Sequence, residues 1–221
     1  LNSMGAKIKG AGSDEIIIDG TDNLNGTKFS IPADRIEAGT YLVAAAITGG
    51  NVTLSNVQAP RMNNILHKLK LSGASINISK DNIQLSMNKG SILPVDISTA
   101  PFPGFPTDMQ AQFTVLNALS NGSSVVTENV FENRFMHVQE LNRMGCDITV
   151  KGSNAFVKGV GSLNGAPVMA TDLRASASLI LAGLCANGET IVDRIYHIDR
   201  GYERIEEKLS YLGADITRLP N

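Results

Sequence analysis

Three aspartates stand a few residues before runs of apolar residues, where a helix would begin: Asp34, Asp108 and Asp172. In one interpretation each carboxylate caps the helix by accepting hydrogen bonds from its first free N–H groups, an interaction worth about 1 kcal/mol. In the other, the carboxylate accepts a proton from a substrate hydroxyl, while Arg35 and Arg174 hold an anion at the positive helix ends. The stiff proline-rich segment just before Asp108 favours the second interpretation there, and the sequence leaves both open.

Two further segments place arginine among aromatic and acidic residues. The first, 128–137, includes Val130 and Arg134, and the second, 193–204, includes Arg200 and has four arginines or histidines within eleven residues. Because a guanidinium group matches carboxylate and phosphate geometry, the second segment predicts an anion-binding surface, with surface ion pairing as the alternative. For the first segment the alternative to a functional role is a solvated loop with two anchoring aromatic residues.

Other reactive residue types form no recognisable site. The three histidines and the two cysteines, Cys146 and Cys185, lack the short spacings of a metal site. We therefore expect no metal site and two reduced cysteines. A net charge of −2 offers no basic surface for nucleic acid. The longest apolar stretch, 177–186, is about half of a membrane-spanning helix, so no membrane contact is expected.

The elements that must position these side chains repeat along the sequence. A Gly-Ala/Cys-x-Ile motif occurs four times, with its glycines at positions 5, 73, 145 and 213. Each later glycine follows a short amphipathic helical pattern, and all four precede alternating apolar residues. We therefore expect each glycine to take the left-handed conformation just past a helix and to be followed by a strand.

Three runs that are apolar on nearly every face recur at a similar spacing, at 41–47, 113–119 and 177–186. A helix of this kind must be buried on all sides. One unit therefore consists of a strand, a buried helix, a strand, an amphipathic helix and two more strands. Three units of this kind, at roughly 26–88, 94–159 and 165–221, predict an α/β fold whose sheets enclose the helices.

The pattern is incomplete at both ends. The third unit stops after residues 215–217 without its last strand, and residues 1–22 resemble the tail of an earlier unit that closes with a strand at 15–18. The simplest account is a piece of a longer protein in which the missing strand lies upstream. A closed third sheet built from these residues alone would refute it.

Five longer motifs surround the candidate residues. They are DRIEAGT at 34–40, FPTDMQAQ at 105–112, FENRFMH at 131–137, ATDLRAS at 170–176 and YHIDRGYE at 196–203. These motifs closely resemble the UDP-N-acetylglucosamine 1-carboxyvinyltransferases of the enolpyruvyl transferase family, and the similarity extends in order along the whole chain. The family fold consists of two inside-out α/β barrels of three units each, with the active site in the cleft between them. The resemblance implies that residues 1–22 are a remnant of the N-terminal barrel. Residues 23–221 are then the C-terminal barrel without the strand that the extreme N-terminus supplies.

The implied reaction joins phosphoenolpyruvate to UDP-N-acetylglucosamine. The sugar 3′-hydroxyl attacks C2 of phosphoenolpyruvate, a tetrahedral intermediate forms, and phosphate leaves. By resemblance Asp108 deprotonates the hydroxyl, Val130 binds the UDP-sugar through its backbone, and Arg200 holds phosphoenolpyruvate. The remaining cleft residues are Asp172, counted as catalytic, and Arg134, Arg174 and Arg35, counted as substrate-binding. No metal or cofactor is implied. The family catalyses the first committed step of bacterial peptidoglycan synthesis in the cytoplasm, on which cell-wall growth, shape and division depend, and the full-length protein is expected to be monomeric.

The chain also departs from the family. The flexible loop with its cysteine, a lysine near the N-terminus and further arginines are absent, and neither cysteine here can replace the loop cysteine. We therefore expect no turnover from this chain without the N-terminal barrel. Two alternatives stay open: the related transferase that acts on shikimate 3-phosphate, and a non-catalytic interaction module.

Overall fold

A computed structural model describes residues 1–13 and 15–219, which form two compact units, 1–32 and 33–221. The division lies ten residues beyond the boundary expected after residue 22. The first unit has a short 3-10 helix, η1 (Asn2–Met4), and two antiparallel strands, β1 (Lys7–Lys9) and β2 (Ile17–Asp19). The strand expected near residues 15–18 is thus present. The origin of this unit in a preceding barrel stays a prediction.

The strand expected to open the first repeat, near residue 26, is not formed. Residues 20–34 contain neither helix nor strand, and residues 20–31 are exposed. A strand is stable only when a neighbour satisfies its backbone groups. Among the described residues, no strand pairs with this segment. This part of the predicted repeat is therefore wrong.

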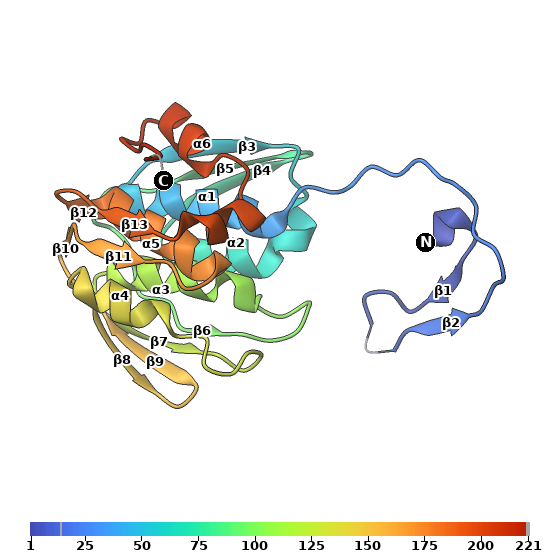
Figure 1. The fold of residues 1–221 in the computed structure, drawn as a ribbon, viewed down its shortest axis with the longest axis horizontal. Coiled ribbons are helices and arrows are strands. Elements are labelled where there is room, and N and C mark those ends of the chain that lie inside the picture. The colour runs from blue at the N-terminus through green and yellow to red at the C-terminus, as the bar shows by residue number, and fades with distance from the viewer. Residues whose placement is uncertain (14, 220–221) are drawn as a thin grey trace. The chain divides into compact units, whose positions relative to one another are not determined.

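Three helices form the centre of the second unit: α1 (Arg35–Thr48), α3 (Gln110–Ala118) and α5 (Leu173–Cys185). They pack against one another, and most of their side chains are buried on every face. Figure 1 shows them enclosed between sheets of the same unit. Close packing is visible at Gly39 of α1, where an added Cβ would lie 2.9 Å from the methyl group of Met109. The prediction of three enclosed helices is confirmed.

Two sheets cover these helices. The first has the order β3 (Asn51–Ser55), β5 (Asn82–Ser86) and β4 (Ser75–Ser79), all antiparallel, and is accompanied by η2 (Ala59–Met62) and α2 (Asn63–Leu71). The second has the order β6 (Ile97–Ser98), β7 (Ser123–Thr127), β9 (Asn154–Lys158) and β8 (Asp147–Lys151), with β6 parallel to β7, and is accompanied by α4 (His137–Arg143). In β5, Ile83 and Leu85 are buried while Gln84 is exposed, which is the alternation expected of a sheet with one face on the core.

In the third repeat the strands are short and form two sheets of two strands each. Strand β11 (Pro167–Met169) lies parallel to β13 (Ile191–Asp193), and β10 (Leu163–Asn164) lies parallel to β12 (Ala186–Asn187). They are followed by η4 (Ile195–Arg200) and α6 (Ile205–Tyr211). Residues 212–219 contain no strand, so β13 is paired on one side only within the described chain. Within the described residues the third repeat thus lacks its last strand, as predicted.

The repeated glycines have the backbone conformation that their position predicts. Gly5, Gly73, Gly145 and Gly213 have φ angles between 96° and 100°, a conformation that a side chain disfavours. Each lies just after a helical turn, and the first three lead into a strand. The strand predicted after Gly213, at residues 215–217, is not formed, because no described strand pairs with this segment. Among the described residues, no helix has both the length and the apolar character needed to cross a bilayer.

Candidate active site at the helix starts

Two of the three aspartates are helix caps. Asp34 accepts hydrogen bonds from the backbone N–H groups of Ile36 (2.7 Å) and Glu37 (3.3 Å) at the start of α1. Asp172 does the same at the start of α5, where the N–H groups of Arg174 and Ala175 lie 2.8 and 2.9 Å from its Oδ1. Its Oδ2 has no hydrogen-bond partner among the described residues. Asp172 can therefore cap the helix with one oxygen and offer the other to a ligand.

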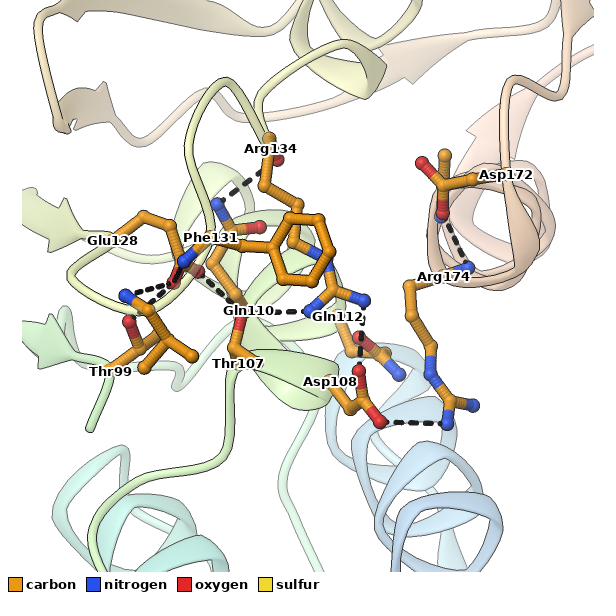
Figure 2. Close-up of polar contacts among 12 residues, drawn as sticks. Thr99, Thr107, Asp108, Gln110, Gln112, Glu128, Phe131, Arg134, Asp172 and Arg174 are labelled. Carbon is orange, nitrogen blue, oxygen red and sulfur yellow. Dashed lines mark hydrogen bonds and ion pairs between the residues drawn. The ribbon is translucent and has the colours of Figure 1, made fainter. Parts of the chain in front are cut away.

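Asp108 does not cap a helix. It lies in the short 3-10 helix η3 (Thr107–Met109) that precedes α3, and its carboxylate faces two arginines. Arg134 donates from Nη2 to Oδ1 at 2.8 Å, and Arg174 donates from Nη2 to Oδ2 at 3.1 Å. Figure 2 shows Asp108 between the two guanidinium groups, which come from different repeats. The side chains of Arg134 and Arg174 are 19% and 12% exposed, whereas that of Asp108 is 39% exposed.

The two arginines determine the ionisation of this carboxylate. Partial burial acts to raise the pKa of Asp108, but the hydrogen bonds and positive charges of Arg174 and then Arg134 outweigh it, so the net pKa is lowered. Asp108 is therefore an anion at neutral pH. A carboxylate in this state can accept a proton, and the arginines beside it can bind an anionic ligand.

A buried glutamate organises the loop that carries Arg134. Glu128 is 4% exposed, and its carboxylate accepts hydrogen bonds from the hydroxyls of Thr99 (2.7 Å) and Thr107 (2.8 Å). It also accepts from the backbone N–H groups of Val130 (2.9 Å) and Phe131 (3.0 Å), as Figure 2 shows in part. These four bonds fix the start of the loop next to η3, and so bring the Arg134 segment close to Asp108.

Thr107 and Phe131 hold the guanidinium of Arg134 itself. Its Nη1 donates to the Thr107 hydroxyl at 2.7 Å, and its Cζ lies 5.1 Å from the centre of the Phe131 ring. Val130 is exposed, and because its N–H is bonded to Glu128, its carbonyl is the backbone group left for a ligand.

Arg200 and Arg35 lie outside this ion-paired group. Arg200 ends η4 with an exposed side chain and makes no ion pair among the described residues. Its segment nevertheless packs on α5, and Tyr202, two residues on, contacts Arg174. Arg35 begins α1, and its Cζ lies 5.2 Å from the centre of the Phe102 ring.

Ion pairing accounts for part of the 193–204 segment. Arg204 pairs with Glu207 at 3.4 Å, and Asp199 pairs with Arg218 at 2.7 Å. Surface salt bridges therefore explain these two residues, while Arg200 stays available to an anion. Of the residues predicted from the sequence, the structure brings together Asp108, Arg134 and Arg174, with Asp172 at the start of the same helix as Arg174.

Sequence reasoning missed the polar residues that support the site. In the sequence Glu128 is one member of a mixed loop, and Gln112 and Tyr202 belong to longer motifs without standing out in them. A signal was present, because a glutamine inside an apolar helix must find a buried partner. Gln112 of α3 is fully buried and donates to Thr40 and Tyr202.

His137 and Cys146 are buried, and Cys185 is half-buried. Burial lowers the pKa of His137 to about 4, and its Nε2 has no hydrogen-bond partner among the described residues. Burial also raises the pKa of Cys146 to about 12 and that of Cys185 to about 11, so both free cysteines are protonated thiols at neutral pH. Within the described part of the chain, no group of three His, Cys, Asp or Glu side chains could hold a metal ion.

Comparison with known families and curated relatives gives a consistent match. The family described as EPSP synthase (3-phosphoshikimate 1-carboxyvinyltransferase) matches residues 1–209. UDP-N-acetylglucosamine 1-carboxyvinyltransferase of Coxiella burnetii (strain Dugway 5J108-111) is 59% identical over 99% of this chain and 50% of its own length, and the protein of strain RSA 331 gives the same values. The chain thus spans about half the length of the curated relatives it matches.

Solved structures match as well. The enolpyruvyl transferase NikO from Streptomyces tendae has a TM-score of 0.84 and 27% identity, over 98% of this chain and 52% of that one. EPSP synthase from Acinetobacter baumannii has a TM-score of 0.75 at 21% identity, over 99% and 54% of the two chains, a likeness of fold alone. The arrangement of sheets around enclosed helices is thus that of solved enolpyruvyl transferases.

Proposed function

The chain belongs to the EPSP synthase family, and on that premise we propose that it is half of a transferase that moves an enolpyruvyl group from phosphoenolpyruvate to UDP-N-acetylglucosamine. The relatives that share 59% of its residues carry the name of this activity. The observation that carries the proposal is the carboxylate of Asp108, which Arg134 and Arg174 hold as an anion from two sides. A proton acceptor flanked by anion-binding groups is what this reaction requires.

In the proposed mechanism Asp108 accepts the proton of the sugar 3′-hydroxyl. The hydroxyl oxygen bonds to C2 of phosphoenolpyruvate while C3 gains a proton, which gives a tetrahedral intermediate. Loss of a C3 proton and cleavage of the bond between C2 and the phosphate oxygen then restore the double bond and release phosphate. Arg134 and Arg174 neutralise the negative charge on the reacting molecule.

The arginines also regulate the base. While both are bonded to Asp108, its lowered pKa makes it a weak proton acceptor. An incoming phosphate or carboxylate group competes for the same guanidinium N–H groups. When the anion takes one of these hydrogen bonds, the pKa of Asp108 rises, so the carboxylate becomes a stronger base only when substrate is present.

The other predicted residues are assigned by position. Arg200, exposed at the end of η4, is the proposed contact to phosphoenolpyruvate. The Val130 carbonyl is proposed to bind the UDP-sugar, since its N–H is used by Glu128. We assign Asp172 to the site through its second oxygen, and Arg35 to substrate binding at the start of α1.

The proposed partner is the half of the protein that this chain does not cover. A groove of about 800 Å³ runs beside β13 and is lined by residues 188–195 and 215–219, among others. In the second repeat β9 lies between β7 and β8, and pairs with both. In the third repeat β13 takes the place of β7, and residues 215–217 take the place of β8. The groove between them therefore suits one strand that corresponds to β9 and runs antiparallel to β13. We propose that the other half supplies this strand, and that residues 1–22 belong to its barrel and 23–221 to the C-terminal one.

The proposed reaction is the first committed step of peptidoglycan synthesis and would take place in the cytoplasm. Cell-wall growth and division depend on it through this pathway. The complete protein is proposed to act as a monomer.

Phosphate release tests the proposal. We expect none from this chain alone when both substrates are added. We expect release when the chain is joined to the half of its relatives that it does not cover, with UDP-N-acetylglucosamine as acceptor. Turnover with shikimate 3-phosphate instead would favour the related transferase. No turnover and no calorimetric binding of either acceptor by the joined protein would contradict the proposal and favour a non-catalytic module.

A further inference from the structure

The phenol oxygen of Tyr202 lies where the three buried helices meet. Tyr202 is 1% exposed, and its oxygen is 2.9 Å from Thr40 Oγ1 of α1. Gln112 Nε2 of α3 and Arg174 Nη1 of α5 each lie 3.3 Å from the same oxygen. One side chain thus connects a residue from each of the three repeats.

One set of directions satisfies the hydrogen bonds of this cluster. With the single hydroxyl hydrogen of Thr40 donated to the carbonyl of Ile36 at 2.9 Å, Thr40 accepts from Tyr202. Gln112 donates from its amide nitrogen to Thr40 at 3.0 Å and to the phenol oxygen. Arg174 can only donate. The phenol therefore donates once and accepts twice, and its hydrogen-bonding capacity is filled.

This arrangement fixes the guanidinium that contacts Asp108. Nη1 of Arg174 is bonded to the phenol oxygen, and its Nη2 is bonded to Asp108 Oδ2. The Cζ of Arg174 also lies 5.7 Å from the centre of the Tyr202 ring. Because the guanidinium is planar and rigid, holding one nitrogen sets the direction of the other.

We propose that Tyr202 is a positioning residue, which holds Arg174 in the orientation that contacts Asp108 and so sets the strength of the catalytic base. Its effect on catalysis rests on the proposed function, whereas its effect on Arg174 and Asp108 does not. A purely structural role would be to satisfy buried donors, and it would leave the ionisation of Asp108 unchanged when the phenol is removed in a folded protein.

The direct test is the titration of Asp108 in Tyr202→Phe. Carboxyl NMR of this chain follows the Asp108 resonance, identified by its loss in Asp108→Asn. Since the hydrogen bond and the charge of Arg174 lower the pKa of Asp108, we expect Tyr202→Phe, which frees Arg174 to move, to raise this pKa. Tyr211→Phe is the matched control, because Tyr211 is 90% exposed and should leave the titration unchanged. An unchanged titration in a folded Tyr202→Phe would overturn the inference.

Kinetics of the joined protein give a second readout. We expect Tyr202→Phe to lower kcat about 10-fold to 100-fold with a much smaller change in KM, because a displaced Arg174 no longer neutralises the charge on the reacting molecule and this loss outweighs the stronger base. A change confined to KM would count against the inference. If the unaltered protein releases no phosphate, the proposed function fails, yet the titration still decides the role of Tyr202.

A second variant covers the case in which Tyr202→Phe does not fold. Thr40→Val keeps the shape of the side chain and removes the acceptor that orients the phenol. We expect a smaller rise in the pKa of Asp108, and no rise in a folded Thr40→Val would also contradict the inference.

Discussion

At the residue scale, the character of Asp108 comes from its neighbours. Burial alone would raise the pKa of this carboxyl, but Arg174 and Arg134 lower it. The same two arginines are the groups that an anionic substrate would recruit. Base strength and substrate binding are therefore coupled through two side chains, and neither can be altered without affecting the other.

Replacing the base tests this coupling. We expect Asp108→Asn in the joined protein to lower kcat about 10² to 10⁴-fold, because the amide cannot accept the hydroxyl proton. Phosphate release at saturating substrates is the measurement. Asp147→Asn, an exposed position on β8, is the control and should keep full activity. A loss of less than about 10-fold for Asp108→Asn would argue against a role as base.

His137 predicts a pH dependence of stability. Burial lowers its pKa from 6.5 to about 4, so between these values the unfolded chain binds the proton more readily than the folded one. The contribution of His137 to the free energy of unfolding is therefore fully present above pH 6.5, and it falls by about 3 kcal/mol as the pH drops to about 4.

Urea unfolding at several pH values measures this effect. We expect His137→Leu to remove most of the pH dependence in that window, while His67→Leu, at an exposed position on α2, leaves it intact. If the free energy of unfolding depends on pH equally in His137→Leu and in the unaltered chain, another group is responsible for the pH dependence.

At the element scale, sequence patterns predict the helices well. Runs that are apolar on every face identify α1, α3 and α5, and a glycine with positive φ marks the end of each amphipathic helix. The opening strand of the first repeat was not predictable in this way. A strand needs a partner, and the periodicity of residues 26–31 does not say whether one is present.

The cap of α5 can be separated from the charge of Asp172. We expect Asp172→Ala to lower the free energy of unfolding by about 1 kcal/mol and Asp172→Asn to preserve it, since asparagine caps equally well. If Asp172 also takes part in catalysis, Asp172→Asn will lower kcat without lowering stability. Denaturant unfolding and phosphate release on both variants distinguish the two roles. Equal stability losses would contradict the capping role.

The loop that carries Arg134 depends on Glu128. Glu128→Gln replaces an acceptor of four hydrogen bonds with a group that must also donate, so buried donors lose partners. We expect a loss of about 1 to 3 kcal/mol in unfolding free energy and faster hydrogen exchange at Val130 and Phe131. Glu132→Gln, at an exposed position on the same loop, should change neither quantity. Unchanged exchange in Glu128→Gln would exclude this role.

At the scale of the whole molecule, the site depends on contacts between repeats that lie far apart in the sequence. The motifs predicted Asp108, Arg134 and Arg174 as candidates, but their spacing along the chain carries no information about which of them touch. Gln112 and Tyr202 are 90 positions apart and meet only when α3 and η4 pack on α5. Residue types therefore suggest the members of the site, and packing decides how they are connected.

The shared core predicts cooperative unfolding of the second unit. Leu42 of α1 is fully buried between helices and sheet, so we expect Leu42→Ala to cost about 2 to 5 kcal/mol. The loss should appear in all three repeats at once, because one core serves them. Hydrogen exchange across the chain measures this, with Leu212→Ala at an exposed position as control. Destabilisation confined to residues 33–88 would mean that the repeats unfold independently.

The meeting of three helices at a single phenol limits how symmetric this protein can become. A point shared by three similar repeats has room for one ring, so only one repeat can contribute it, and the others must present a hydroxyl and an amide instead. A designed chain of three identical consensus repeats would crowd three tyrosines into that space or leave it empty. Such a design could keep the architecture, yet it would lose the different side chains that the three repeats contribute around this phenol.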